Sequence, residues 1–175
     1  MRRWAAAIAA ATLLAPASAS GAQTRSQTFF RTKITAERST TKPIRDLLGT
    51  GGGFVVKAIV FRDLTGDEKS DAIVRVHSGG AAGVVAVFVF STDTGRRDDE
   101  LRLVFSSQKL QRASTRVADD VLSYRSARYA AGDEPCCPEQ LVESTLEWDA
   151  GDHRLKVAER TVMDGPAPPS AAGGR

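Results

Sequence analysis

The sequence predicts an α+β fold: a mostly antiparallel sheet of about six to eight strands, with one or two short N-terminal helices on one face. Three observations predict it. From residue 54 to residue 162, short apolar or alternating segments follow one another as strands do. These segments are separated by 2 to 13 residues, which leaves little room for crossover helices and favours antiparallel neighbours. Helix start and stop signals lie near the N-terminus.

A short helix of about two turns is predicted between residues 41 and 49. Thr41 fits the N-cap position, and Pro43 lies in the first turn, where its missing N–H costs little. Apolar residues recur on one face, and Gly49 closes the segment. A helix this short is stable only when it packs against the rest of the protein. The preceding segment, Phe29 to Glu37, fits either a strand or a helix.

Eight segments are typical of strands: 54–61, 72–77, 84–90, 101–105, 114–118, 121–129, 142–148 and 154–162. The run at 84–90 is apolar throughout, which indicates a central strand covered on both faces. Asp119 and Asp120 form a two-residue turn between two of these strands.

The first 22 residues predict a secretory signal peptide. Two arginines give a basic start, Trp4 to Leu14 is apolar, and small residues place the cleavage after Ala19 or Ala22. The apolar run is too short to span a bilayer, which needs about 20 residues. We therefore expect a secreted, extracytoplasmic protein.

Both ends of the mature chain are expected to be disordered. Residues 23–28 are small and polar, and residues 164–175 are rich in proline and glycine. Residues 29–163 are expected to form a single globular domain. Its stability must come from a hydrophobic core, because two adjacent cysteines build no disulfide framework.

The net charge of the chain limits its partners. The whole chain has 24 Lys and Arg against 21 Asp and Glu, a formal net charge of +3. Removing residues 1–22 takes away two arginines and no acid, which leaves +1. So small a charge argues against nucleic acid and anionic membranes as partners. No cysteine follows the apolar run directly, so we expect no membrane anchor after signal cleavage.

Oxygen-bearing groups recur along the acidic loop from residue 63 to residue 71. Asp63, Asp67 and Asp71 are four residues apart, and Thr65 lies between the first two. Calcium takes about six to eight hard oxygens, and a tight loop with this spacing wraps around the ion. The loop resembles the strand–loop–strand calcium motif of FG-GAP and VCBS repeats and, more distantly, the EF-hand loop. The resemblance implies a structural calcium ion, held by the side chains of Asp63, Thr65, Asp67 and Asp71 and by the backbone carbonyl of Lys69.

Two positions depart from that motif, and a simpler interpretation stays open beside it. Thr65 stands where Asn or Asp is usual, and Glu68 stands where a glycine would permit the positive φ of a sharp turn. The alternative is that the Asp and Gly residues are turn formers, whose side chains bond to nearby backbone N–H groups.

Cys136 and Cys137 lie between two prolines, and several interpretations compete for them. The first is a vicinal disulfide, a strained ring because adjacent Cα atoms are about 3.8 Å apart and disulfides usually need about 4.4–6.8 Å. The second is a metal pair completed by His77 or His153, for which adjacency is poor. The third is two buried or partly buried thiols without a role. A bridge between two chains is a further alternative.

The sequence favours a binding domain over an enzyme. Its two histidines lie in no nucleophile motif, and Gly-x-Ser-x-Gly does not occur. We expect a non-enzymatic exported domain that binds a protein or a cell-envelope component. Tyr124, Tyr129 and Asp133, which precede the cysteines, are its expected binding surface, although the edge of a core is the commoner place for such tyrosines. The competing hypothesis is a thiol/disulfide redox or metal-dependent protein that uses Cys136 and Cys137.

Four features together resemble a group of uncharacterised secreted proteins of high-GC Gram-positive (actinobacterial) origin. They are the exported N-terminus, the DLTGD segment that begins at Asp63, the loop at residues 78–80, and the segment that runs from Tyr129 through Cys-Cys-Pro and ends near residues 147–149. The group is distantly similar to the mycobacterial LppP/LprE lipoproteins. The resemblance covers about residues 40–160 and implies compartment and fold class, but no specific activity. This sequence has no lipid-attachment cysteine, unlike the lipoproteins.

Overall fold

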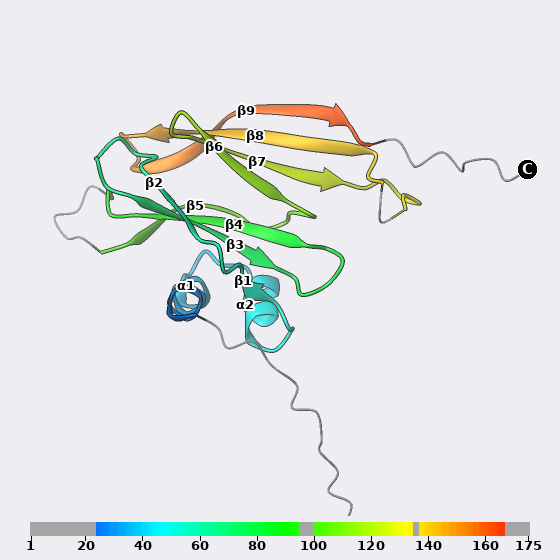
Figure 1. The fold of residues 1–175 in the computed structure, drawn as a ribbon, viewed down its shortest axis with the longest axis horizontal. Helices are drawn as coiled ribbons and strands as arrows, with labels where there is room; N and C mark the ends of the chain where they lie inside the picture. The colour runs from blue at the N-terminus through cyan, green and yellow to red at the C-terminus, as the bar shows by residue number, and fades with distance from the viewer. Residues whose placement is uncertain (1–23, 95–99, 135–136, 167–175) are drawn as a thin grey trace, which may run out of the picture.

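The computed structural model describes residues 24–94, 100–134 and 137–166. These residues form two N-terminal helices and nine strands, which make two antiparallel sheets. Figure 1 shows three layers: the helices, a five-stranded middle sheet, and a four-stranded sheet on the other side. The predicted α+β class is confirmed, with helices on one face of a sheet. The expected single sheet of about six to eight strands is instead two sheets.

Helix α1, Arg25–Ala36, begins with a capping box. The Thr24 hydroxyl accepts the Gln27 N–H, and the Gln27 side chain accepts the Thr24 N–H. The expectation of disorder at 23–28 is therefore wrong for its described part, because this box and the first helical turn lie there. The segment from Phe29 to Glu37, left open between strand and helix, is helical to Ala36.

Helix α2, Lys42–Gly49, has the bounds that the sequence predicts. Thr41 is its N-cap residue and Pro43 lies in its first turn. The Thr41 side chain makes no capping bond in the described chain; its backbone N–H donates to Gln108 Oε1 at 2.7 Å. Both helices bury an apolar face against the middle sheet, through Phe30, Ile34, Ile44 and Leu48.

The middle sheet contains β1 (Phe54–Val55), β2 (Val60–Arg62), β3 (Asp71–His77), β4 (Val84–Ser91) and β5 (Arg102–Ser107). Its order is β1-β3-β4-β5, and β2 shares the edge of β3 with β1. The expected strand 54–61 is two short strands, and between them the Arg75 guanidinium donates to the Ala58 carbonyl at 2.8 Å. β4 is the central strand that its apolar run predicts.

The second sheet contains β6 (Ser114–Ala118), β7 (Val121–Arg128), β8 (Gln140–Asp149) and β9 (Arg154–Asp164), in that order. Asp119 and Asp120 form the predicted two-residue turn, with φ of 50° and 58°. Positive φ at both positions is what the tightest hairpin turns require. β9 ends at Asp164, so the first residue of the expected disordered tail is the last residue of a strand.

β3 and β4 separate two hydrophobic clusters, because successive side chains of a strand point to opposite faces. The cluster toward the helices includes Val74, Val76, Phe88 and Phe90. The cluster toward the second sheet includes Ile73, Val87, Val89, Leu122 and Leu146. Burying one such side chain contributes about 1.5–3 kcal/mol. The middle sheet is thus apolar on both faces, and the second sheet covers the face that the helices leave open.

Some predictions fall wholly or partly on residues outside the described ranges. The signal peptide at 1–22 lies wholly outside them, as do residue 23 of the segment 23–28, residues 167–175 of the tail 164–175, and Cys136 of the cysteine pair. Among the residues that are described, no helix is both long and apolar enough to cross a membrane.

Candidate functional site

Asp63 organises the acidic loop between β2 and β3. Its carboxylate accepts the backbone N–H groups of Thr65 at 3.2 Å, Gly66 at 2.7 Å and Glu68 at 2.9 Å. Burial alone would raise the pKa of Asp63, but these N–H groups outweigh burial and hold the pKa below its ordinary value of 3.8. Asp63 is therefore an acceptor for the turn that follows it.

Thr65, Asp67 and Lys69 form a second set of contacts in this loop. The Thr65 hydroxyl donates to Asp67 Oδ1 at 3.1 Å, and the Lys69 N–H donates to the same oxygen at 2.9 Å. Two of the expected calcium ligands are thus bonded to each other. The Asp67 carboxylate, like that of Asp63, serves the backbone of its own loop.

Asp71, the first residue of β3, is only 1% exposed. Its Oδ2 accepts the Leu64 N–H at 2.7 Å. Burial raises the pKa of Asp71, while bonds from the buried Ser91 hydroxyl and the Leu64 N–H act in the opposite direction. Asp71 thereby connects the acidic loop to the end of β4.

Four of the five residues expected to bind calcium lie in the loop between β2 and β3, and Asp71 is the first residue of β3. The carboxylates of Asp63, Asp67 and Asp71 accept backbone N–H groups, as those of turn formers do. In the described part of the chain, no group of three or more His, Cys, Asp or Glu side chains could hold a metal ion. Glu68 takes φ of 64°, the conformation that the calcium motif gives to glycine. Calcium at this loop stays a prediction.

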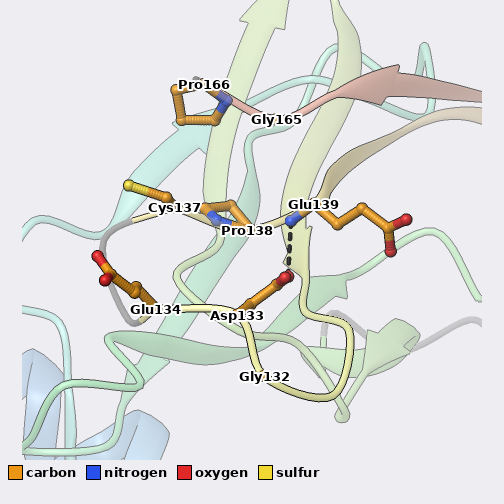
Figure 2. Close-up of a pocket in the computed structure, with 8 residues that line it drawn as sticks. All are labelled: Gly132, Asp133, Glu134, Cys137, Pro138, Glu139, Gly165 and Pro166. Carbon is orange, nitrogen blue, oxygen red and sulfur yellow. Dashed lines mark hydrogen bonds between the residues drawn. The ribbon is translucent and has the colours of Figure 1, made fainter. Parts of the chain in front are cut away.

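A second aspartate, Asp133, closes the connection between β7 and β8. Its Oδ2 accepts the N–H of Ala130 and the N–H of Glu139, both at 2.8 Å. Figure 2 shows the Asp133 carboxylate aimed at the Glu139 N–H across the loop. Ala130 lies near the start of this connection and Glu139 lies at its end. The Asp133 side chain therefore holds the two ends of the connection at a fixed distance from each other.

This connection borders a hollow of about 450 Å³, lined by Gly132, Asp133, Glu134, Cys137, Pro138, Glu139, Gly165 and Pro166. The Cys137 N–H donates to the Glu134 carbonyl at 3.0 Å. In Figure 2 the Cys137 sulfur points away from the Asp133 carboxylate. Cys136 lies outside the described residues, so the expected bond between the two cysteines stays a prediction.

The chain just after β9 packs against this loop through Gly165. The Gly165 N–H donates to the Glu139 carbonyl at 2.8 Å. A Cβ at this position would lie 1.7 Å from the Pro138 oxygen, so no side chain fits without a shift of the backbone. Glycine at 165 therefore allows the end of β9 to form one wall of the hollow.

A smaller hollow of about 250 Å³ shares Asp133 and is lined by Ala81, Ala82, Gln111, Arg112, Tyr129 and Asp133. Arg112 Nη1 donates to the Tyr129 hydroxyl at 3.4 Å, and the Arg112 backbone N–H donates to the Ala82 carbonyl at 2.8 Å. Gly83 has φ of 64°, and a Cβ there would lie 3.3 Å from the Arg112 Cα. The glycine lets the loop before β4 approach Arg112 closely.

The structure brings together two of the three residues expected to form a binding surface. Tyr129 and Asp133 line the smaller hollow, but Tyr124 is 6% exposed and packs against Phe105, with ring centroids 5.8 Å apart. The placement of Tyr124 on the surface is therefore wrong. Tyr124 pairs with Ser144 on the face of the second sheet that is turned toward the core.

Neither histidine lines the hollow beside Cys137. His77 stacks on Phe54, with ring centroids 4.9 Å apart, and its Nδ1 accepts the Gly79 N–H at 2.9 Å. His153 Nδ1 lies 3.4 Å from Asp93 Oδ1. A metal pair completed by either histidine thus gains no support from the described residues.

Sequence reasoning missed Arg112 and the two alanines. Arg112 is 17 positions from Tyr129 in the chain, and only the pairing of β6 with β7 brings the two together. The glycines around Ala81 and Ala82 marked a connection between strands and gave no sign of what lies opposite. Comparison with models of known protein families, with curated proteins and with solved structures gives no match for this chain.

Proposed function

We propose that the protein is an exported, non-enzymatic domain that binds a protein or a cell-envelope component. The observation that carries the proposal is the position of Asp133, which accepts two hydrogen bonds of 2.8 Å and lines two hollows at once. A loop held in this way needs little further ordering when a partner binds. We call the residues Ala81, Ala82, Arg112, Tyr129 and Asp133 the Asp133 surface.

The Asp133 surface combines apolar and charged groups. The alanine side chains and the Tyr129 ring offer apolar contact, and the Arg112 guanidinium has the planar geometry that suits a carboxylate. Arg112 donates to Tyr129, so the two side chains are oriented together. These are recognition groups, and they favour a partner that presents an apolar group beside a carboxylate, as a peptide segment does.

Co-sedimentation with insoluble cell-envelope material tests this proposal. The mature protein is mixed with envelope from a high-GC Gram-positive bacterium, and the pelleted fraction is measured over a range of protein concentrations. We expect saturable binding, which Tyr129→Ala and Arg112→Ala each weaken about ten-fold, as interface hot spots do. Arg116→Ala, on the exposed side of β6, is the matched control and keeps wild-type binding.

Protease treatment of the envelope separates the two kinds of partner. Loss of binding after digestion identifies a protein, and unchanged binding identifies another envelope component. Equal binding by wild type, Tyr129→Ala and Arg112→Ala would contradict the Asp133 surface. Absence of saturable binding to either preparation would contradict the binding function.

The alternative proposal is a thiol/disulfide redox or metal-dependent function of Cys136 and Cys137. One observation favours it: Cys137 lies in the wall of the larger hollow, beside Asp133. In the redox form, a vicinal disulfide takes two electrons and two protons from a dithiol reductant, which becomes oxidised, and yields two thiols.

Intact mass measured before and after a dithiol reductant tests this alternative. A gain of two hydrogens, together with thiols that titrate only after reduction, supports a vicinal disulfide. Two thiols that titrate without reductant contradict the redox form. Added zinc that leaves their titration unchanged contradicts the metal-dependent form.

Export is a proposal as well, and the N-terminus of the secreted protein tests it. We expect the protein in the culture medium to begin directly after Ala19 or Ala22. A cell-retained protein that still carries residues 1–22 would contradict cleavage and export.

A further inference from the structure

The helical layer is much more basic than the rest of the chain. Residues 25–49, which hold both helices and their connection, contain six Lys and Arg against two Asp and Glu, a net charge of +4. Residues 50–175 contain 16 basic and 19 acidic side chains, a net charge of −3. Figure 1 places both helices on the same outer face of the middle sheet. The small overall charge therefore conceals a positive face.

Four arginines of this layer have no acidic partner within the described ranges: Arg25, Arg31, Arg38 and Arg45. Arg31 donates to the Gly49 carbonyl at 3.1 Å, and Arg45 donates to the Thr40 carbonyl. These acceptors are uncharged carbonyls, so neither bond places a negative charge beside the guanidinium group.

The two lysines of the layer are different, because each is paired with an acid. Lys33 lies 3.2 Å from Glu100, and Lys42 lies 2.5 Å from Asp46, one helical turn away. The arginines therefore account for the positive field of this face. Arginine is also the better ligand for phosphate oxygens, because its planar fork of donors binds two of them at once.

An exposed aromatic ring lies among these charges. Phe29 is 47% exposed, whereas its neighbour Phe30 is 3% exposed. Arg25 precedes Phe29 by four residues, so the two share the outward face of α1. The Lys33 ammonium lies 6.0 Å from the centre of the Phe29 ring. Exposed aromatic rings enter the membrane interface, and basic side chains are attracted to anionic lipid headgroups, so the two kinds of group together suit a lipid surface.

We propose that the helical layer docks on a membrane surface that carries anionic lipid headgroups. The arginines bind headgroup phosphates and Phe29 enters the interface, as a peripheral contact. A soluble polyanion would gain from the arginines but not from the exposed ring, so Phe29 favours lipid.

Vesicle co-sedimentation tests the proposal with the mature protein. We expect no binding to phosphatidylcholine vesicles and clear binding when about one third of the lipid is phosphatidylglycerol. Raising the salt from about 0.1 M to about 1 M shortens the Debye length from about 10 Å to about 3 Å and should release the protein. Each basic residue near such a surface accounts for about a five-fold change in affinity, so Arg25→Gln/Arg38→Gln should bind about 25-fold more weakly.

A matched variant distinguishes binding through the helical layer from binding that depends only on the net charge of the protein. Arg116→Gln/Arg160→Gln removes the same charge from exposed positions of β6 and β9 in the second sheet, and we expect it to bind as wild type does. Phe29→Ala should weaken vesicle binding several-fold and leave binding to soluble polyphosphate unchanged. Circular dichroism confirms that each variant is folded.

Three results would overturn the proposal. Equal losses in the two double variants would mean that binding follows net charge rather than the helical layer. Binding to polyphosphate without binding to anionic vesicles would assign the layer to a soluble polyanion. Binding to neither would leave the face without this role. The Asp133 surface is tested separately, because its residues lie outside the helical layer.

Discussion

Two loops of this protein are each organised by one aspartate, and they differ in how far that aspartate reaches. Asp63 accepts backbone N–H groups from residues two, three and five positions after it. Asp133 accepts from Ala130, three positions before it, and from Glu139, six positions after it. Asp63 therefore shapes a tight turn, whereas Asp133 closes a wide loop and leaves two hollows beside it.

The difference shows that a loop whose sequence resembles a binding motif is not necessarily the place where the structure forms a hollow. The acidic spacing around Asp63 is typical of a calcium loop, yet its carboxylates are occupied by the backbone of the same loop. Asp133 belongs to no metal-binding pattern; it lies in the segment that ends in Cys-Cys-Pro, and it positions the candidate site. What separates them is the length of chain that each carboxylate bridges, which the residue types alone do not reveal.

The largest effect is expected from Asp71→Ala, because it leaves the Leu64 N–H and the Ser91 hydroxyl without their acceptor inside the protein. Each buried polar group left unpaired costs about 1–3 kcal/mol, so the free energy of unfolding should fall by about 3 kcal/mol. Asp71→Asn keeps an acceptor oxygen and should cost about 1 kcal/mol. Urea unfolding measures both, and equal, small losses would show that these bonds do not hold the loop.

Asp133→Ala should have the next largest effect, a loss of about 2 kcal/mol, because it removes two bonds to a charged acceptor. The N–H groups of Ala130 and Glu139 should also exchange faster with solvent. Asp133→Asn is the control that keeps an acceptor. Asp63→Ala tests the same property in the other loop. It should lower the free energy of unfolding by less than Asp133→Ala does, because water replaces the carboxylate at an exposed turn. A larger loss for Asp63→Ala would reverse the distinction between the two loops.

Most of the fold was predictable because its signals are local. The strand at 114–118 and the turn after it follow from alternation and from the conformations that turn residues adopt. The predictions that failed, for the strand at 54–61 and for disorder at 23–28, concern segments whose structure is set by contacts with distant parts of the chain. Arg75 bonds to Ala58 in the gap between β1 and β2, and the Gln27 side chain donates to the Val55 carbonyl at 2.6 Å and so holds the start of α1.

The candidate site was predictable only in part, for the same reason. Tyr129 and Asp133 were identified because they precede the cysteines in the chain. Arg112 and Ala82 come from other hairpins, and no local pattern links them to the site. Tyr124 was misplaced because the prediction followed its closeness to the cysteines in the chain. In the structure Tyr124 pairs with the buried Ser144, and its side chain points into the core.

A smaller effect is expected at the strained position of the tight turn. Glu68→Gly should stabilise the protein by about 0.5–1 kcal/mol, because φ of 64° is unfavourable for a residue with a Cβ. Gly66→Ala, where φ is 80°, should destabilise it by about 1 kcal/mol. Thermal unfolding measures both shifts. A lower Tm for Glu68→Gly would mean that the Glu68 side chain itself stabilises the loop.

The pH dependence of stability should separate Asp63 from Asp71. The pKa of Asp63 is lowered on folding, so its contribution is present above 3.8 and is lost as the pH falls through the folded pKa. The pKa of Asp71 is raised, so its contribution is present below 3.8 and is lost as the pH rises through the folded pKa. In unfolding curves between about pH 2 and 7, Asp63→Asn should lessen the loss of stability in acid, and Asp71→Asn should lessen the loss on raising the pH. Identical profiles would contradict the opposite signs.

The smallest effect is expected from calcium. The Asp63 and Asp67 carboxylates bond to backbone N–H groups of their own loop, and an ion would have to compete with those bonds. We therefore expect the same Tm in saturating calcium as in chelator, with magnesium as the control for ionic strength. An ion present at a hundred times its Kd would add about 2.7 kcal/mol and raise the Tm by about 5–10 °C. Such a rise in the wild type but not in Asp67→Asn would make the loop a calcium site. The two aspartate-held loops would then both serve binding, one by closing on an ion and the other by leaving a surface open.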